Sequence, residues 1–112
     1  MNNKQITTRY NRIVKLYEGK DPGGVNCYRC PQGHITKTID KDPGVTPFLH
    51  LCHKCGDMAT SSFYNDTHPD IEPVEEWYRP SLKKVLKMKK DQQMLDHILN
   101  GGLDVRKIKK NG

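Results

Sequence analysis

Apolar residues are scarce in this sequence. Hydrophobic residues make up 34% of its 112 residues and aromatic residues 7%, with one tryptophan and two phenylalanines. The mean hydropathy is −0.84. A chain of this size and composition suffices for one small domain with a thin core. Such domains often need an additional stabilising element, and a structural metal is one of the usual kinds.

Long apolar runs are absent as well. No stretch approaches the roughly 20 apolar residues that a membrane-spanning helix needs, so we expect no membrane partner. The first residues, 1–5, are polar and no apolar run follows them, so we expect no signal peptide. These absences favour a cytoplasmic location, and no small-molecule substrate is evident.

Cysteine occurs only four times, in two matched pairs. The pairs are Cys27-Tyr28-Arg29-Cys30 and Cys52-His53-Lys54-Cys55, with 21 residues between them, 31 through 51. Two Cys-x-x-Cys turns are typical of a tetrahedral zinc site, because two intervening residues let both sulfurs reach one ion. The sequence predicts one structural Zn²⁺ bound by four thiolates, which leaves no position for water and indicates a protein without enzyme activity. The predicted metal ligands are Cys27, Cys30, Cys52 and Cys55.

Several alternatives to this site remain open on the sequence alone. Two disulfides would require an oxidising compartment, and four thiolates also suit iron. His34, four residues after Cys30, could replace one cysteine as a ligand. A His-Asn-His nuclease paired with a zinc knuckle is a further idea, although the spacing does not form its usual ββα pattern. The residues that suggest it are His50, His53, Asn65 and His68.

Glycines follow both cysteine pairs at different distances. A turn that donates backbone N–H groups to a metal-bound thiolate bends sharply and often needs a positive φ. Gly56 follows Cys55 directly, whereas Gly33 follows Cys30 only after Pro31 and Gln32. The two knuckles are therefore not expected to be identical.

The predicted fold is a small, metal-stabilised α+β domain. It comprises a Cys₄ zinc ribbon, with two knuckles on a small antiparallel sheet, and a C-terminal helical segment. Within a single domain the regions are an N-terminal extension (1–25), the zinc-ribbon module (26–65), an acidic, proline-rich connector (66–80) and a basic helical segment (81–112).

Local patterns assign elements to these regions. In the extension both a helix and a strand fit, and alternation favours a strand over 12–18. Strands are predicted in the zinc-ribbon module at 34–39, 48–51 and 60–65, with 48–51 returning on 34–39 after a turn. The connector is predicted to be irregular, with Trp77 and Tyr78 as anchors. Residues 81–99 read as one helix or two, capped by Ser81 and Asp91, and a short strand or tail follows the Asn100-Gly101-Gly102 stop.

Positive charge is concentrated at one end of the chain. Residues 1–80 contain 10 Lys and Arg against 10 Asp and Glu, whereas residues 81–112 contain 9 against 3, so the last 32 residues carry the whole net charge of +6. Nearly all these cations are lysines, which suit phosphate attraction better than base reading. A solvated helix face is the alternative. The predicted nucleic-acid contacts are Lys83, Lys84, Lys87, Lys89, Lys90, Arg106, Lys107, Lys109 and Lys110.

Two stretches resemble known proteins. The cysteine pairs with Gly56 resemble zinc-ribbon proteins in general, and Glu76-Trp77-Tyr78-Arg79-Pro80 followed by Asn100-Gly101-Gly102-Leu103 and Arg106 resembles small zinc-ribbon proteins encoded by bacteriophages. The resemblance implies a phage protein in the host cytoplasm, either nucleic-acid-binding or transcription-associated. The alternative is a protein-interaction module that binds a host enzyme, a polymerase or a virion component through residues 66–76 and Trp77, without direct nucleic-acid contact. Zinc ribbons serve several roles, so the fold alone does not decide between them.

Overall fold

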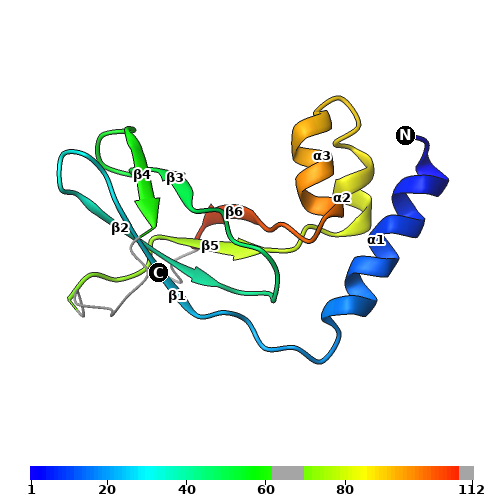
Figure 1. Ribbon diagram of the computed structural model, residues 1–112, viewed down its shortest axis with the longest axis horizontal. Helices are drawn as coiled ribbons and strands as arrows, with labels where there is room; N and C mark the ends of the chain where they lie inside the picture. The colour runs from blue at the N-terminus through cyan, green and yellow to red at the C-terminus, as the bar shows by residue number, and fades with distance from the viewer. Residues whose placement is uncertain (62–69, 109–112) are drawn as a thin grey trace.

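The computed structural model describes residues 1–61 and 70–108 and shows a small α+β protein. Within these residues a curled six-stranded sheet occupies one end of the molecule and the helices the other (Figure 1). The elements are α1 (Asn3–Tyr17), β1 (Val25–Arg29), β2 (Ile35–Asp40), β3 (Leu49–Leu51), β4 (Met58–Ser61), β5 (Glu75–Tyr78), α2 (Leu82–Leu86), α3 (Gln92–Leu99) and β6 (Asp104–Lys107). None of the described helices is long and apolar enough to cross a membrane.

The strand order is β3-β4-β1-β2-β5-β6. Four neighbouring pairs are antiparallel, but β2 and β5 run parallel. The strands that flank the two cysteine-bearing turns, β1 to β4, pair antiparallel as expected, and the parallel β2–β5 pairing extends the sheet beyond them. The expected return of 48–51 onto 34–39 is wrong, because β3 pairs with β4 while β2 lies between β1 and β5. The predicted strand at 60–65 begins earlier, as β4, and residues 62–65 lie outside the described part of the chain.

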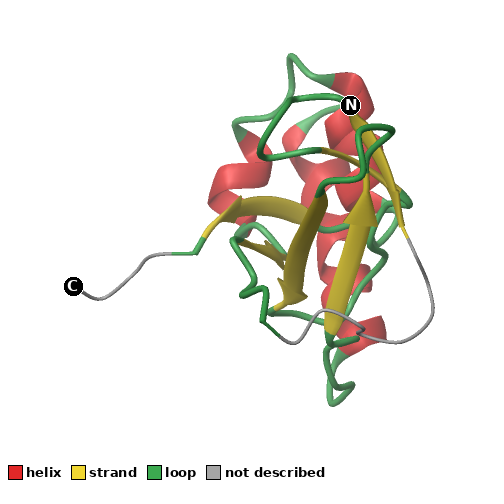
Figure 2. Cartoon of the chain, turned by 90° about the vertical axis from the view of Figure 1, so that its left-hand side faces the viewer, coloured by secondary structure: helices red, strands yellow, loops and turns green. Residues whose placement is uncertain are grey.

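The sheet curls so strongly that strands far apart in its order approach each other. His50 of β3 shares a 2.9 Å hydrogen bond between its Nε2 and Oε1 of Glu75 in β5. Its ring centroid lies 5.2 Å from that of Trp77 and 5.5 Å from that of Tyr28. The concave side encloses one of two hydrophobic clusters, formed by Tyr28, Cys30, Cys52, Ala59, Trp77 and Leu103. Figure 2 views the molecule from the sheet end, with the strands curving in front of the helices.

Helix α1 replaces the strand predicted over 12–18. Asn2 caps it in a capping box with Gln5, which satisfies backbone donors of the first turn. Ile6 is fully buried and packs with α2 and α3 in the second hydrophobic cluster, whose other buried members are Val85, Leu95, Ile98 and Leu99. Val14 and Leu16, the apolar residues that suggested alternation, are 42% and 56% exposed. The segment therefore forms a helix, because the apolar side of that helix packs against α2 and α3.

The C-terminal half contains two short helices and a strand. Ser81 and Asp91 accept hydrogen bonds from Lys84 N–H and Met94 N–H as the predicted caps of α2 and α3. The end of the connector is not irregular, because Glu75–Tyr78 forms β5 between β2 and β6. Trp77 is only 4% exposed and its Nε1–H donates to Thr38 Oγ1 at 2.9 Å. It is therefore a core residue and presents no docking surface.

Candidate metal centre

Two hairpin turns bring together Cys30, His34, Cys52 and Cys55. One ligand atom of each residue lies within 4.8 Å of those of the other three. Cys30 and His34 flank the turn between β1 and β2, and Cys52 and Cys55 lie in the turn between β3 and β4. Figure 1 shows both turns at the end of the sheet that is remote from the helices. The arrangement could hold one metal ion.

The first turn is closed by backbone hydrogen bonds around Cys30. The Cys30 N–H donates to His34 O at 3.1 Å, and the Gly33 N–H donates to Cys30 O at 2.9 Å. Gly33 adopts a φ of 87°, a conformation that costs little only for glycine. Gly33, which follows Cys30 after two intervening residues, is therefore part of a tight Cys-x₃-His turn.

The second turn follows the same plan. The Cys52 N–H donates to Asp57 O and the Gly56 N–H donates to Cys52 O, both at 2.8 Å. Gly56 has a φ of 76°, and Lys54 N–H donates to Cys52 Sγ at 3.4 Å. Backbone donors thus approach a ligand sulfur, as metal-bound thiolates require.

A polar contact joins the two turns behind the cluster. Thr36 Oγ1 of β2 lies 2.9 Å from His53 Nδ1 and accepts the His53 N–H at 3.2 Å. His53 therefore contacts Thr36 and does not belong to the cluster of possible metal ligands. That cluster, called the ligand group below, is Cys30, His34, Cys52 and Cys55. This contact fixes the spacing between the hairpins on which a shared metal would depend.

Cys27 lies outside the ligand group, so the predicted set of four cysteines is not the set that the structure brings together. Cys27 is inside strand β1, where it stands opposite Lys37 of β2, while Tyr28 stands opposite Thr36. Side chains alternate between the two faces of a strand. Cys27 is thus on the face opposite to Tyr28, which belongs to the cluster that contains Cys30. His34 takes the place expected for Cys27, an alternative that the Cys30-x₃-His34 spacing had left open.

The four side chains lie close enough together to coordinate one metal ion. Two thiolates bound to one zinc at about 2.3 Å lie about 3.8 Å apart in a tetrahedron, and Cys30 Sγ and Cys55 Sγ are separated by 3.7 Å. None of the four cysteines is joined to another by a disulfide in the structure. His34 Nδ1 is buried and has no hydrogen-bond partner among the described residues. A three-cysteine, one-histidine set is a known structural zinc type.

The thiols of Cys52 and Cys55 differ in pKa. Burial raises the pKa of Cys52, but hydrogen bonds from the backbone of Cys55 and Lys54 outweigh it and bring the pKa to about 6. The Asp57 backbone lowers the pKa of Cys55, yet burial and the neighbouring thiols Cys52 and Cys30 raise it to about 11. Neighbouring thiols therefore resist joint ionisation, and a bound cation would reverse this by favouring the thiolates.

Three cations near the two cysteine pairs, Arg29, Lys37 and Lys54, lie at different places around the ligand group. Three thiolates, one neutral histidine and Zn²⁺ carry a net −1, less than the −2 of a four-cysteine site. Lys54 lies in the second turn beside Cys52. Lys37 is buried and pairs in register with Cys27, so it shares the face of Cys27. Arg29 is exposed at the end of β1.

His50 and His97, two further histidines in the described residues, have structural partners. His50 contacts Glu75, Tyr28 and Trp77 inside the curled sheet. His97, which sequence reasoning placed on an exposed face, is half-buried, and its Nε2 lies 2.9 Å from Leu103 O. Asn65 and His68, the other residues behind the nuclease idea, lie outside the described residues.

The predicted phosphate-contacting cations occupy two regions. Those in the described residues are all exposed: Lys83 and Lys84 in α2, Lys87, Lys89 and Lys90 between α2 and α3, and Arg106 and Lys107 in β6. Lys109 and Lys110 lie outside the described residues. Two of the cations converge, since the Lys84 ammonium lies 4.8 Å and the Arg106 guanidinium carbon 4.1 Å from the centroid of the Tyr78 ring.

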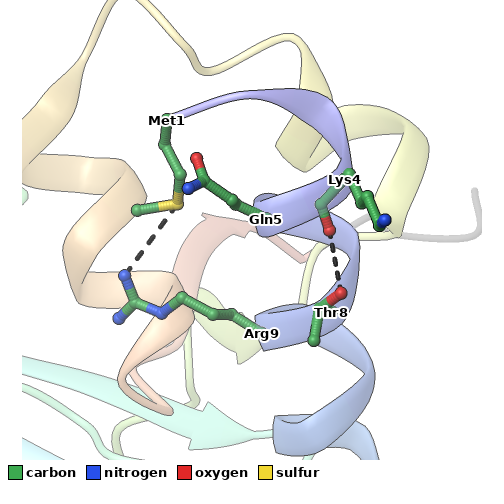
Figure 3. A pocket seen from close by; sticks show the side chains of 5 residues that line it. All are labelled: Met1, Lys4, Gln5, Thr8 and Arg9. Atoms are coloured by element: carbon green, nitrogen blue, oxygen red, sulfur yellow. Dashed lines mark hydrogen bonds between the residues drawn. The ribbon is translucent and has the colours of Figure 1, made fainter.

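A cavity of about 590 Å³ lies along the N-terminal half of α1 (Figure 3). It is lined by Met1, Lys4, Gln5, Thr8 and Arg9. Arg9 Nη1 lies 3.9 Å from Met1 Sδ, and Thr8 Oγ1 donates to Lys4 O at 2.9 Å. None of the five residues is buried. The cavity thus offers no desolvated polar group to orient a ligand, and we assign it no role.

Comparison with known proteins gives no match: no protein-family model, no curated protein and no solved structure resembles the chain closely enough to count as one.

Proposed function

We infer that this is a non-enzymatic, zinc-stabilised protein that binds nucleic acid through the cations of its C-terminal third. The observation that carries the inference is the convergence of Lys84 and Arg106 on Tyr78. These cations are 22 positions apart and come from a helix and a strand, so the fold brings two of the predicted cations together beside one ring.

The metal is assigned a structural role. Cys30, His34, Cys52 and Cys55 supply four protein ligands, which fill a tetrahedral coordination sphere and leave no position for a reacting water. Bound zinc would hold the β1–β2 and β3–β4 turns together. Structural zinc contributes on the order of 10–16 kcal/mol in small domains, comparable with the whole stability of such a domain.

The cations are assigned to phosphate contacts. Lysine ammonium groups attract the phosphate backbone without reading bases, and the predicted set contains a single arginine in the described residues. We therefore expect sequence-independent binding. The resemblance to phage zinc-ribbon proteins supports a role near host or phage nucleic acid, because zinc ribbons occur in transcription factors and polymerase subunits.

Fluorescence anisotropy with a labelled DNA or RNA oligonucleotide tests this function. Each phosphate contact that is lost should reduce the slope of log affinity against log salt by about 0.7–0.9. The variant Lys83→Gln/Lys87→Gln/Lys89→Gln should therefore bind more weakly and with a shallower slope. The control Lys4→Gln/Lys15→Gln/Lys20→Gln removes equal charge from the N-terminal part of the chain and should bind like the wild type.

Two results would count against nucleic-acid binding. One is salt-independent affinity, and the other is the absence of binding by the zinc-loaded protein at low salt. Absence of binding, together with an identified protein that is retained after nuclease treatment of a bacterial lysate, would favour the protein-interaction alternative.

A further inference from the structure

A cationic pocket lies where the sheet meets α2. It has a volume of about 370 Å³, and its lining includes Lys41, Asp42, Tyr78, Arg79, Lys84 and Arg106. These residues come from the ends of β2 and β5, from α2 and from β6, four segments that are distant in sequence. Four cations and one carboxylate give the lining a net charge of +3.

Two of the lining cations contact the Tyr78 side chain. Lys84 Nζ contacts the Tyr78 hydroxyl, and the Arg106 guanidinium covers the ring. Arg106 Nε also donates to Glu76 Oε1 at 2.7 Å, which fixes the arginine from the side. Glu76 is not part of the pocket lining. Both cations are therefore held at defined positions around a single aromatic ring.

Backbone hydrogen bonds position the lining residues Lys41 and Arg79. The Lys41 N–H donates to Trp77 O at 2.7 Å, and the Arg79 N–H donates to Asp42 Oδ2 at 2.8 Å. The one carboxylate of the lining is thus already engaged. The Arg79 guanidinium donates to Pro43 O and lies 4.7 Å from the Tyr17 ring centroid. Its Nε is buried and has no hydrogen-bond partner in the part of the chain that the structure describes.

Arg106 is paired with Glu76, but the lining has three further cations against the single carboxylate of Asp42, so a bound anion would reduce the Coulomb repulsion among them. Two guanidinium groups and two ammonium groups match the several acceptor oxygens of a phosphate. A concave site suits a free or terminal phosphate, which projects all its oxygens, better than an internal phosphodiester. We propose that this pocket binds a phosphate group.

The phosphate could come from two sources with the same chemistry. One is free phosphate, and the other is the terminal phosphate of a nucleic acid. Only the second source rests on the proposed nucleic-acid function. The test therefore uses inorganic phosphate in one arm and, in the other, an oligonucleotide with or without a 5′-phosphate.

The zinc-loaded protein is titrated with inorganic phosphate and followed by ¹H–¹⁵N NMR. Shifts should concentrate at Lys41, Tyr78, Lys84 and Arg106. The variant Lys84→Gln/Arg106→Gln should lose at least about 10-fold in phosphate affinity, because charge-assisted hydrogen bonds are lost. The matched control Lys4→Gln/Lys15→Gln removes the same charge from α1, outside the lining, and should stay within about twofold of the wild type.

The outcomes separate the two proposals. Equal weakening in the variant and the control, or shifts spread over all the lysines, would overturn the pocket even if nucleic acid binds. Phosphate binding that is lost only in the pocket variant supports the pocket even if oligonucleotides do not bind. A 5′-phosphate that raises oligonucleotide affinity, with the gain lost in the pocket variant, identifies the terminal phosphate as the source.

Discussion

The sulfur atoms of Cys30 and Cys55 lie 3.7 Å apart although the two residues are 25 positions apart in the sequence. This spacing suits two thiolates on one tetrahedral zinc. It also requires the β1–β2 and β3–β4 turns to stay in contact. The ligand group therefore lies between two hairpins that are also joined by the short β1–β4 pairing, Tyr28 with Ser61 and Arg29 with Thr60, and by the contact of Thr36 with His53.

Removing the metal should affect the two ends of the molecule differently. A chelator should abolish amide-exchange protection first in β1–β4, because the ligands sit at the ends of these strands. Helices α1, α2 and α3 have a separate hydrophobic cluster and should keep their protection longer. Hydrogen-exchange mass spectrometry with and without chelator measures this. Unchanged protection in the hairpins would argue against a stabilising metal.

Substitutions in α1 distinguish the helix from the strand predicted over 12–18. Ile6 is fully buried, so Ile6→Ala should lower the free energy of unfolding by about 2–5 kcal/mol. Leu16 is 56% exposed, so Leu16→Ala should change it by less than about 0.5 kcal/mol. Urea denaturation gives both values. A larger cost for Leu16→Ala than for Ile6→Ala would favour the strand.

Gly102 packs directly against the His97 ring. A Cβ at this position would lie 2.2 Å from His97 Cε1, so Gly102→Ala must displace the imidazole from its hydrogen bond with Leu103 O. We expect a loss of about 1–3 kcal/mol in unfolding free energy. In a double-mutant cycle, His97→Ala should relieve part of this loss. Strictly additive costs would show that the two residues do not interact.

Alkaline pH should destabilise the protein through Tyr28. Burial raises the pKa of Tyr28 above its ordinary value of 10.0, with the Asp40 charge as a second cause. The folded state thus keeps a proton that the unfolded state releases, so stability is intact below about pH 10 and falls as pH rises further. Denaturation followed from pH 8 to 11 measures the slope. Tyr28→Phe, which also loses the hydrogen bond to Pro47 O, should start less stable but show a smaller fall.

Local sequence patterns predicted the features that are formed locally. The proximity of Cys52 and Cys55 was predictable because both residues and Gly56 belong to one tight turn. The caps at Ser81 and Asp91 are equally local. The spacing of Cys27 and Cys30 did not reveal that Cys27 lies inside strand β1, because the same spacing occurs in turns and in strands, where side chains three apart face opposite sides.

Non-local pairing accounts for most of the other errors. Residues 75–78 follow a proline-rich acidic stretch and have no clear strand pattern, yet they form β5 because β2 and β6 supply partners on both sides. Residues 12–18 fit two periodicities, and the choice depended on whether α2 and α3 were there to cover the apolar side. No local pattern contains that information.

Zinc content of single-ligand variants tests the central claim most directly. Mass spectrometry of purified protein should find one zinc per chain in the wild type and in Cys27→Ser, because Cys27 lies outside the ligand group. Cys30→Ser should contain much less than one, and His34→Ala should lose its zinc to a weaker chelator than the wild type does. The opposite pattern, in which Cys27→Ser loses zinc and His34→Ala retains it as tightly as the wild type, would contradict the Cys₃His centre and restore the four-cysteine site.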